Sequence, residues 1–279
     1  MMHRLHRHWR GYYLSYLALL LLAIPTALPI LIMLIISGKD FNQYMMNPLA
    51  PSLPFHFDNY EVAWGVMAQS FLNNLIIIGI STFAILLFGS LTAYALSRYV
   101  FPGRQLLFFF VLGVLAIPSA VILVPSFMLI VKLGVLNTLW AVILPYAAQQ
   151  SFVIFVLTTF FATLPEEMFE SARLDGAGHL SIYAHIVLPL SWPIMSAMAI
   201  FEVWFHWNDY AWPSLVLSDP DLQTVAQRLV AFTDAQINVR PEPGQAMAAS
   251  VIASIPLVLL FIFSMRTFIA GLTSGAVKM

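Results

Sequence analysis

The chain has 279 residues, of which 61% are hydrophobic and 9% are charged, whereas about 25% of the residues in a soluble domain are charged. This composition excludes a soluble globular protein and indicates an integral membrane protein. The absence of cysteine excludes disulfides and thiolate metal sites, and a net charge of −1 without a basic stripe gives no sign of nucleic-acid binding.

Six apolar segments are long enough to cross a bilayer as a helix, which takes roughly 20 residues. The first follows a basic stretch, but its apolar core is longer than the roughly 7–15 residues of a signal peptide, so we expect an uncleaved span. The predicted fold is all-α, a polytopic membrane protein with six transmembrane helices in one domain over residues 1–279. The predicted spans are 12–36, 71–96, 106–131, 139–161, 186–207 and 246–268.

The distribution of Lys and Arg predicts that both termini are cytoplasmic, because cytoplasmic loops of membrane proteins carry an excess of these residues. Two long loops, 37–70 and 208–245, then face the outside, where they could dock a soluble partner or only cap the helices. The predicted inner set is Arg4, Arg7, Arg10, Arg98, Arg104, Arg173, Arg266 and Lys278, and the outer set is Lys39, Lys132, Arg228 and Arg240.

A polar segment, residues 164–178, carries five of the charged residues and lies on the predicted cytoplasmic side, inside a loop over 162–185. Thr163 and Glu166 have capping-box spacing, and Pro165 suits a first helical turn. Asp175 and Gly176 suit a helix end, because glycine accepts the left-handed conformation there. We expect a short helix of about three turns with a partly apolar face, which either lies on the membrane or docks into a groove on another protein.

The same segment resembles a known signature. Glu170, Ser171 and Ala172, followed after three residues by Gly176 and after nine more by the run 186–189, resemble the EAA signature of permease subunits of bacterial ATP-binding-cassette importers. The departure is Ser171 in place of alanine. Much of the chain further resembles the MalG-type carbohydrate permeases, with Met279 in place of the usual glycine. The matching segments are 73–75, 93–98, 101–104, 117–118, 133–138, 207–210 and 271–278.

The resemblance implies a transport subunit of the cell inner membrane that works with partners. They are a second homologous permease subunit, a cytoplasmic ATPase dimer that holds ATP and Mg²⁺, an extracytoplasmic sugar-binding protein, the lipid bilayer and a small sugar substrate. The short helix would be the coupling helix that fits a groove of the ATPase, and the C-terminal tail would reach into the ATPase dimer. The chain lacks G-x-x-x-x-G-K-[ST], so any ATP hydrolysis is expected from a partner. The implied coupling residues are Glu166, Glu170, Ser171, Ala172, Asp175, Gly176 and Ala177, and the implied tail contacts are Ser274, Gly275 and Lys278.

Polar side chains inside the spans are candidates for the substrate pathway. Glu202, His206 and Asp209 share one helical face, where they are either a proton relay or substrate contact, or a hydrogen-bonded patch facing the partner permease. Tyr146 shares a face with Gln149 or Gln150, and these groups suit either sugar hydroxyls or contacts between helices.

Three functions remain open at this point. The first is a permease subunit of an ATP-driven sugar importer that works by alternating access, with no catalytic, cofactor or metal site in this chain. The alternative is a self-contained ion-coupled secondary transporter that uses Glu202, His206 and Asp209. The third, an intramembrane enzyme, lacks any recognisable motif. The capped cytoplasmic helix favours the first, since a secondary transporter has no need of it.

Overall fold

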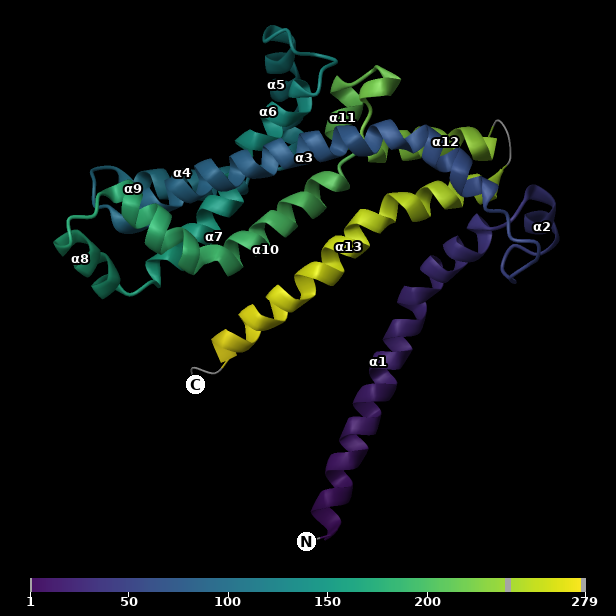
Figure 1. Ribbon diagram of the computed structural model, residues 1–279, viewed down its shortest axis with the longest axis horizontal. Helices are drawn as coiled ribbons and strands as arrows, with labels where there is room; N and C mark the ends of the chain where they lie inside the picture. Colours follow the sequence, from purple (N-terminus) through teal and green to yellow (C-terminus); the bar gives the residue numbers. More distant parts are fainter. Residues whose placement is uncertain (1, 239–241, 277–279) are drawn as a thin grey trace. The chain divides into compact units, whose positions relative to one another are not determined.

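The computed structural model describes residues 2–238 and 242–276, and every regular element within them is helical (Figure 1). The all-α fold expected from the composition is therefore confirmed. The elements in the first half of the chain are α1 (Met2–Ser37), α2 (Phe41–Met46), α3 (Asp58–Arg98), α4 (Arg104–Leu115), α5 (Ser119–Lys132) and α6 (Trp140–Ala148). They are followed by α7 (Ser151–Ala162), α8 (Glu166–Leu174), α9 (His179–Ile182), the π-helical segment η1 (Tyr183–Val187), α10 (Leu188–Trp207), α11 (Ala211–Val216), the 3₁₀ turn η2 (Pro220–Leu222), α12 (Val225–Asn238) and α13 (Pro243–Ala276).

Five helical stretches among the described residues are long and apolar enough to cross a membrane, and a bent helix pair makes up to six. The pair is α4 and α5, which meet at 99°. The predicted span over 106–131 is therefore present as a bent helix pair rather than a straight helix. Pro118 explains the break, because it has no backbone N–H and disfavours a helical conformation at the residue before it. The five stretches are Leu19–Ser37, Asp58–Arg98, Trp140–Ala162, His179–Trp207 and Pro243–Ser264.

The fourth predicted span, 139–161, is also divided, since α6 ends before Gln149 and α7 begins at Ser151. Gln149 leaves the helical region with φ −81° and ψ 63°. Both glutamines singled out in the sequence thus stand at an interruption within a span. Gln149 is exposed there, and the amide of Gln150 donates to the carbonyl oxygen of Ala147 at 2.7 Å.

One compact unit comprises residues up to Met67 together with 229–254. The loop after α1 is held by side chains rather than by regular structure. The Asn59 amide donates to the carbonyl oxygens of Ser37 and Lys39, both at 2.9 Å. The fully buried Lys39 ammonium donates to the carbonyl oxygens of Asn47 and Ala50. The loop 37–70, predicted to face outside, is therefore an ordered substructure that includes α2.

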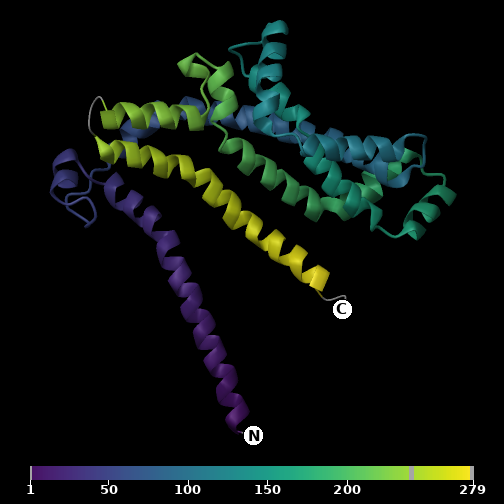
Figure 2. The ribbon, with the colours of Figure 1, turned by 180° about the vertical axis from the view of Figure 1, so that it is seen from behind.

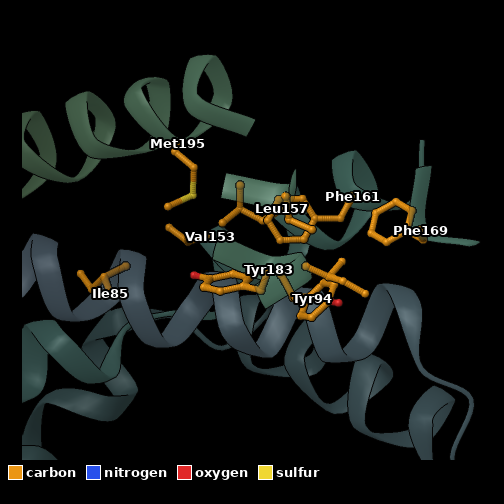
Figure 3. Packing of buried hydrophobic residues seen from close by; sticks show 11 residues of the cluster. Ile85, Tyr94, Val153, Leu157, Phe161, Phe169, Tyr183 and Met195 are labelled. Atoms are coloured by element: carbon orange, nitrogen blue, oxygen red, sulfur yellow. The ribbon is translucent and has the colours of Figure 1, made fainter. Parts of the chain in front are cut away.

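The second unit comprises 68–228 and the chain from Ile255 onward. Its apolar core gathers where the end of α3 meets α7, α8, η1 and α10 (Figure 3). Within this unit α8 lies at one extremity, beyond the ends of α7 and α9, in both views of the ribbon (Figures 1 and 2). The core is made by Ile85, Ala93, Tyr94, Val153, Leu157, Phe161, Phe169, Ile182, Tyr183, Val187 and Met195.

The other long loop, 208–245, is largely helical in its described residues, and asparagine side chains attach its first part to α3. The Asn73 amide donates to the carbonyl oxygens of Asp221 and Gln223 at 2.8 and 3.1 Å. The neighbouring Asn74 accepts from the backbone N–H of Val225 at 3.1 Å. These buried asparagines, which belong to the segment 73–75 of the family resemblance, thus tie η2 and the start of α12 to α3.

Candidate functional site: the polar loop and a buried polar cluster

The helix expected in the polar segment is present as α8, but its start differs from the prediction. Thr163 ends α7 instead of capping α8, and its hydroxyl donates to the carbonyl oxygen of Phe160 at 2.7 Å. Pro165 occupies the cap position, outside the first turn, and offers no side-chain hydrogen bond. The predicted capping box is therefore wrong, because Thr163 already serves the preceding helix. Glu166 is left free to pair with other side chains.

The end of α8 follows the prediction. Asp175 is the C-cap residue of α8. Gly176, which follows it, adopts φ +81°, a left-handed conformation that glycine accepts without steric cost. The N–H of Gly176 donates to the carbonyl oxygen of Arg173, and that of Ala177 donates to Ala172 at 2.9 Å. The last turn therefore pairs the carbonyls that a helix end leaves open.

Some of the predicted coupling residues are exposed on the surface of the loop, and others pack against the protein core. Glu170, Ser171, Asp175 and Gly176 are exposed, whereas Ala172 and Ala177 pack against the core of the second unit. The apolar face expected for α8 points inward through Phe169, which is 2% exposed. Since all the exposed members of the set lie on or just after α8, they form a polar surface on a helix that is fixed from behind.

Arg98, the last residue of α3, makes the attachment behind α8. Its guanidinium donates to the carbonyl oxygens of Phe161 and Leu164 and to Glu166 Oε2, the last two at 2.7 and 2.8 Å. The same group lies 3.9 Å from the centre of the Phe169 ring, a cation–π contact. The Arg98 side chain is 11% exposed. Sequence reasoning counted this residue only as a cytoplasmic charge and as part of a resembling segment.

A second set of side chains joins α3 to the far side of the polar loop. The Tyr99 hydroxyl is hydrogen-bonded to His179 Nδ1 at 2.8 Å and to the Tyr94 hydroxyl at 3.2 Å. Deeper along α3, the hydroxyls of Ser90 and Tyr183 lie 2.6 Å apart. Tyr183 begins η1, so the π-helical segment that leads from the loop into α10 is also attached to α3.

The other candidates form a buried polar cluster. His206 Nε2 lies 3.2 Å from Glu202 Oε2, and both side chains are 5% exposed or less. The ring of Tyr146 stacks on that of His206, with centroids 3.9 Å apart. The Tyr146 hydroxyl donates to Asp209 Oδ2 at 2.8 Å, and Asp209 Oδ1 accepts from the N–H of Trp212. Glu202 and His206 thus share a face of α10 as predicted, whereas Asp209 lies beyond the end of α10 at Trp207, so the predicted common helical face is wrong for Asp209.

The structure changes one of the expectations for this cluster. Its members contact one another between α6, α10 and α11, and whether the patch also faces a second permease stays a prediction. Tyr146 belongs to it rather than to a group with Gln149 and Gln150, which stand at the break between α6 and α7. In this conformation Tyr146, Glu202 and His206 present almost no surface to a solute.

The predicted contacts of the C-terminal tail are only partly covered by the structure. Lys278 lies outside the described residues, and for Ser274 and Gly275 only the backbone, within α13, is described. Their predicted role at the ATPase stays a prediction.

A helical membrane protein with a rigid polar helix between two spans has the architecture of a transport permease. The chain belongs to the family of binding-protein-dependent transport system inner membrane components, whose family model matches residues 85–274. The family expected from the EAA spacing is confirmed.

Two relatives agree with this membership, and a solved structure shares the fold. The chain is 34% identical to the melibiose/raffinose/stachyose import permease protein MelC of Bacillus subtilis, covering 90% of this chain and 91% of MelC. It is 31% identical to the trehalose/maltose transport system permease protein MalG of Thermococcus litoralis, covering 93% and 94%. A crystal structure of a bacterial ABC transporter that imports the acidic polysaccharide alginate shares the fold, with a TM-score of 0.82 at 20% identity over 92% of this chain and 96% of that one.

The Tyr146 contacts lead to a prediction about stability. Replacing Tyr146 by Phe removes the hydroxyl that pairs with the half-buried Asp209, and losing a hydrogen bond to a charged group costs about 1.5–3 kcal/mol. We expect Y146F to lower the midpoint of thermal unfolding of the purified chain in detergent. The matched control is Y210F, because Tyr210 is 46% exposed. Equal midpoints for both variants would show that the cluster contributes nothing to stability.

Proposed function

We propose that this chain is the permease subunit of an ATP-driven importer of disaccharides, oligosaccharides or related sugars, and that it forms half of the translocation pathway beside a second, homologous permease. The observation that carries the proposal is a polar helix held rigidly between two spans of a chain that belongs to a binding-protein-dependent transport family. The sugar class is supported by the import functions for which MelC and MalG are named.

The energy enters through α8. The chain carries no Walker A motif, so ATP and Mg²⁺ bind to a separate cytoplasmic ATPase. A short helix with an exposed polar face suits a groove on such a partner, and Glu170, Ser171 and Asp175 provide that face. Closing of the ATPase dimer would move α8 and the spans attached to it as a body and open the pathway outward, and hydrolysis would reset it. Both termini then lie in the cytoplasm.

Substrate arrives from the opposite side. An extracytoplasmic sugar-binding protein would dock on the ordered outer loops, which contain α2 in one unit and α11 with η2 in the other. Gln149 and Gln150 are the better candidates for contact with the sugar, because they stand at a helix interruption within a span, where backbone and amide groups can meet hydroxyls. Tyr146, Glu202 and His206 would first have to separate from one another.

The ion-coupled alternative loses its main support. It depended on Glu202, His206 and Asp209 acting as a proton relay, and Asp209 is instead hydrogen-bonded to Tyr146 and Trp212, apart from the buried Glu202–His206 pair, in which both ring nitrogens of His206 lack a hydrogen-bond partner among the described residues. They form a short, closed cluster that joins α10 and α11 to α6. The importer function is therefore the one proposal retained.

A change at Gly176 tests the docking role of α8. A β-branched residue at φ +81° is strained, at a cost of about 1–3 kcal/mol, so G176V should distort the exposed end of α8. We expect G176V to reduce the amount of ATPase that co-purifies with the chain. The matched control is G178V, because Gly178 has φ −73° and open space around its Cα. Normal ATPase recovery with G176V would count against docking through α8.

Uptake into proteoliposomes tests the function as a whole. The panel of radiolabelled probes is maltose, melibiose and raffinose. We expect uptake of at least one probe when this chain is reconstituted with the second permease, the ATPase, the binding protein and internal ATP. We expect none when this chain alone is given a proton gradient. Uptake by the chain alone, driven by the gradient, would overturn the proposal in favour of the secondary transporter.

A further inference from the structure

Two short linkers are the covalent connections between α8 and the neighbouring helices of its unit. Residues 163–165 alone connect α7 to α8, and residues 175–178 alone connect α8 to α9. Gly176 and Gly178 in the second linker lack side chains that could pack. A nine-residue helix on two short linkers is free to tilt unless other contacts fix it. Those contacts therefore decide whether a force on α8 reaches the spans.

Arg98 provides contacts of the required kind to three separate pieces of chain. It binds the carbonyl oxygen of Phe161 at the end of α7, that of Leu164 in the linker, and the carboxylate of Glu166 in the first turn of α8. The face of Phe169, also in α8, covers the guanidinium. Arg98 itself ends α3, so one side chain joins α3, α7 and α8.

The chemistry of these contacts requires a guanidinium. A helix end leaves its last carbonyls without partners, and a planar group with five donors can bind two carbonyls and a carboxylate together while stacking on a ring. A lysine ammonium can supply the charge but not the fixed fork. Glu166 is held in place from its other side, because its second oxygen pairs with Arg173. The side chain of Arg98 is nearly buried, so water competes little for its bonds to the two carbonyl oxygens, whereas the Glu166 carboxylate is 53% exposed and its ion pair is weakened by water.

We infer that Arg98 is the positioning residue that makes α8, the end of α7 and the end of α3 one rigid body, so that displacement of α8 by the ATPase moves these spans. This inference rests on the proposed function. The inference adds to the proposed function by naming the side chain that transmits the movement of α8 to α3, a helix that is remote from the polar loop in the sequence. Without Arg98, the ATPase would still bind the exposed face of α8, but only the packing of Phe169 and Ala172 against the core would hold α8, so it would tilt more readily under load.

The test compares transport with ATP consumption in the complete reconstituted complex. R98Q and R98K are measured against R104Q, because Arg104 also lies near the end of α3 but has only a 3.5 Å contact to the carbonyl oxygen of Ser97. The readouts are co-purified ATPase, the rate of ATP hydrolysis, and labelled sugar imported per ATP hydrolysed. The sugar is whichever of maltose, melibiose and raffinose the wild-type complex imports.

We expect R98Q to retain the ATPase and to hydrolyse ATP, while sugar imported per ATP falls by about ten-fold or more. R98K should recover part of that ratio, because it keeps the charge opposite Glu166, and R104Q should match the wild type. A contact that only supports folding would lower assembly, hydrolysis and import together. An unchanged import per ATP in R98Q would overturn the inference.

A second measurement does not depend on the folding of any Arg98 variant. The chain has no native cysteine, so spin labels can be placed at T92C on α3 and L174C at the end of α8, both exposed positions, in a complex shown to remain active. The distance between the labels should stay constant when ATP is added and when it is hydrolysed. A distance that changes during the cycle would overturn the rigid body. A wild-type complex without ATP-driven uptake would instead refute the proposed function.

Discussion

Every helix end releases backbone N–H and C=O groups, and those that are buried from water need partners within the protein. In this chain, side chains from other elements meet these groups at the breaks. Arg98 binds the carbonyls at the end of α7, and Asn73 binds the backbone of η2. Within α6, the Trp212 indole donates to the carbonyl oxygen of Ala141, which Pro145 leaves without its helical partner. The breaks are therefore the places where distant segments are joined, and both candidate sites lie beside such joints.

Contacts between distant segments have different consequences at the polar loop and at the buried polar cluster. At the polar loop, they hold a helix firmly from behind and leave its polar surface exposed, which suits a helix that transmits force. At the cluster of Tyr146, Glu202, His206 and Asp209, they close polar groups onto each other between α6, α10 and α11. A polar group within a span is therefore not by itself a sign of substrate contact. Its role depends on whether other side chains of the protein already bind it.

Local features were predictable from the sequence, and convergence of distant segments was not. The helical spans follow from the length of the apolar segments. The end of α8 follows from Gly176, because a helix commonly ends at a glycine with positive φ. The bend at Pro118 was missed because prolines also occur within intact membrane helices. The capping box failed because Thr163 could serve either of two neighbouring helices. The roles of Arg98 and Tyr146 depend on how α3 meets α7 and how α6 meets α10, which spacing along the chain does not encode.

The central claim is that the exposed face of α8 is where this chain meets a cytoplasmic ATPase. Single cysteines test it in a chain that has none, with S171C on α8 compared with M46C on the outer loop, where Met46 is 87% exposed. A cysteine-to-amine crosslinker is added to membranes that contain the assembled complex. The account predicts a covalent product with the ATPase from S171C and none from M46C. A product from M46C but not from S171C would contradict both the predicted topology and the role of α8.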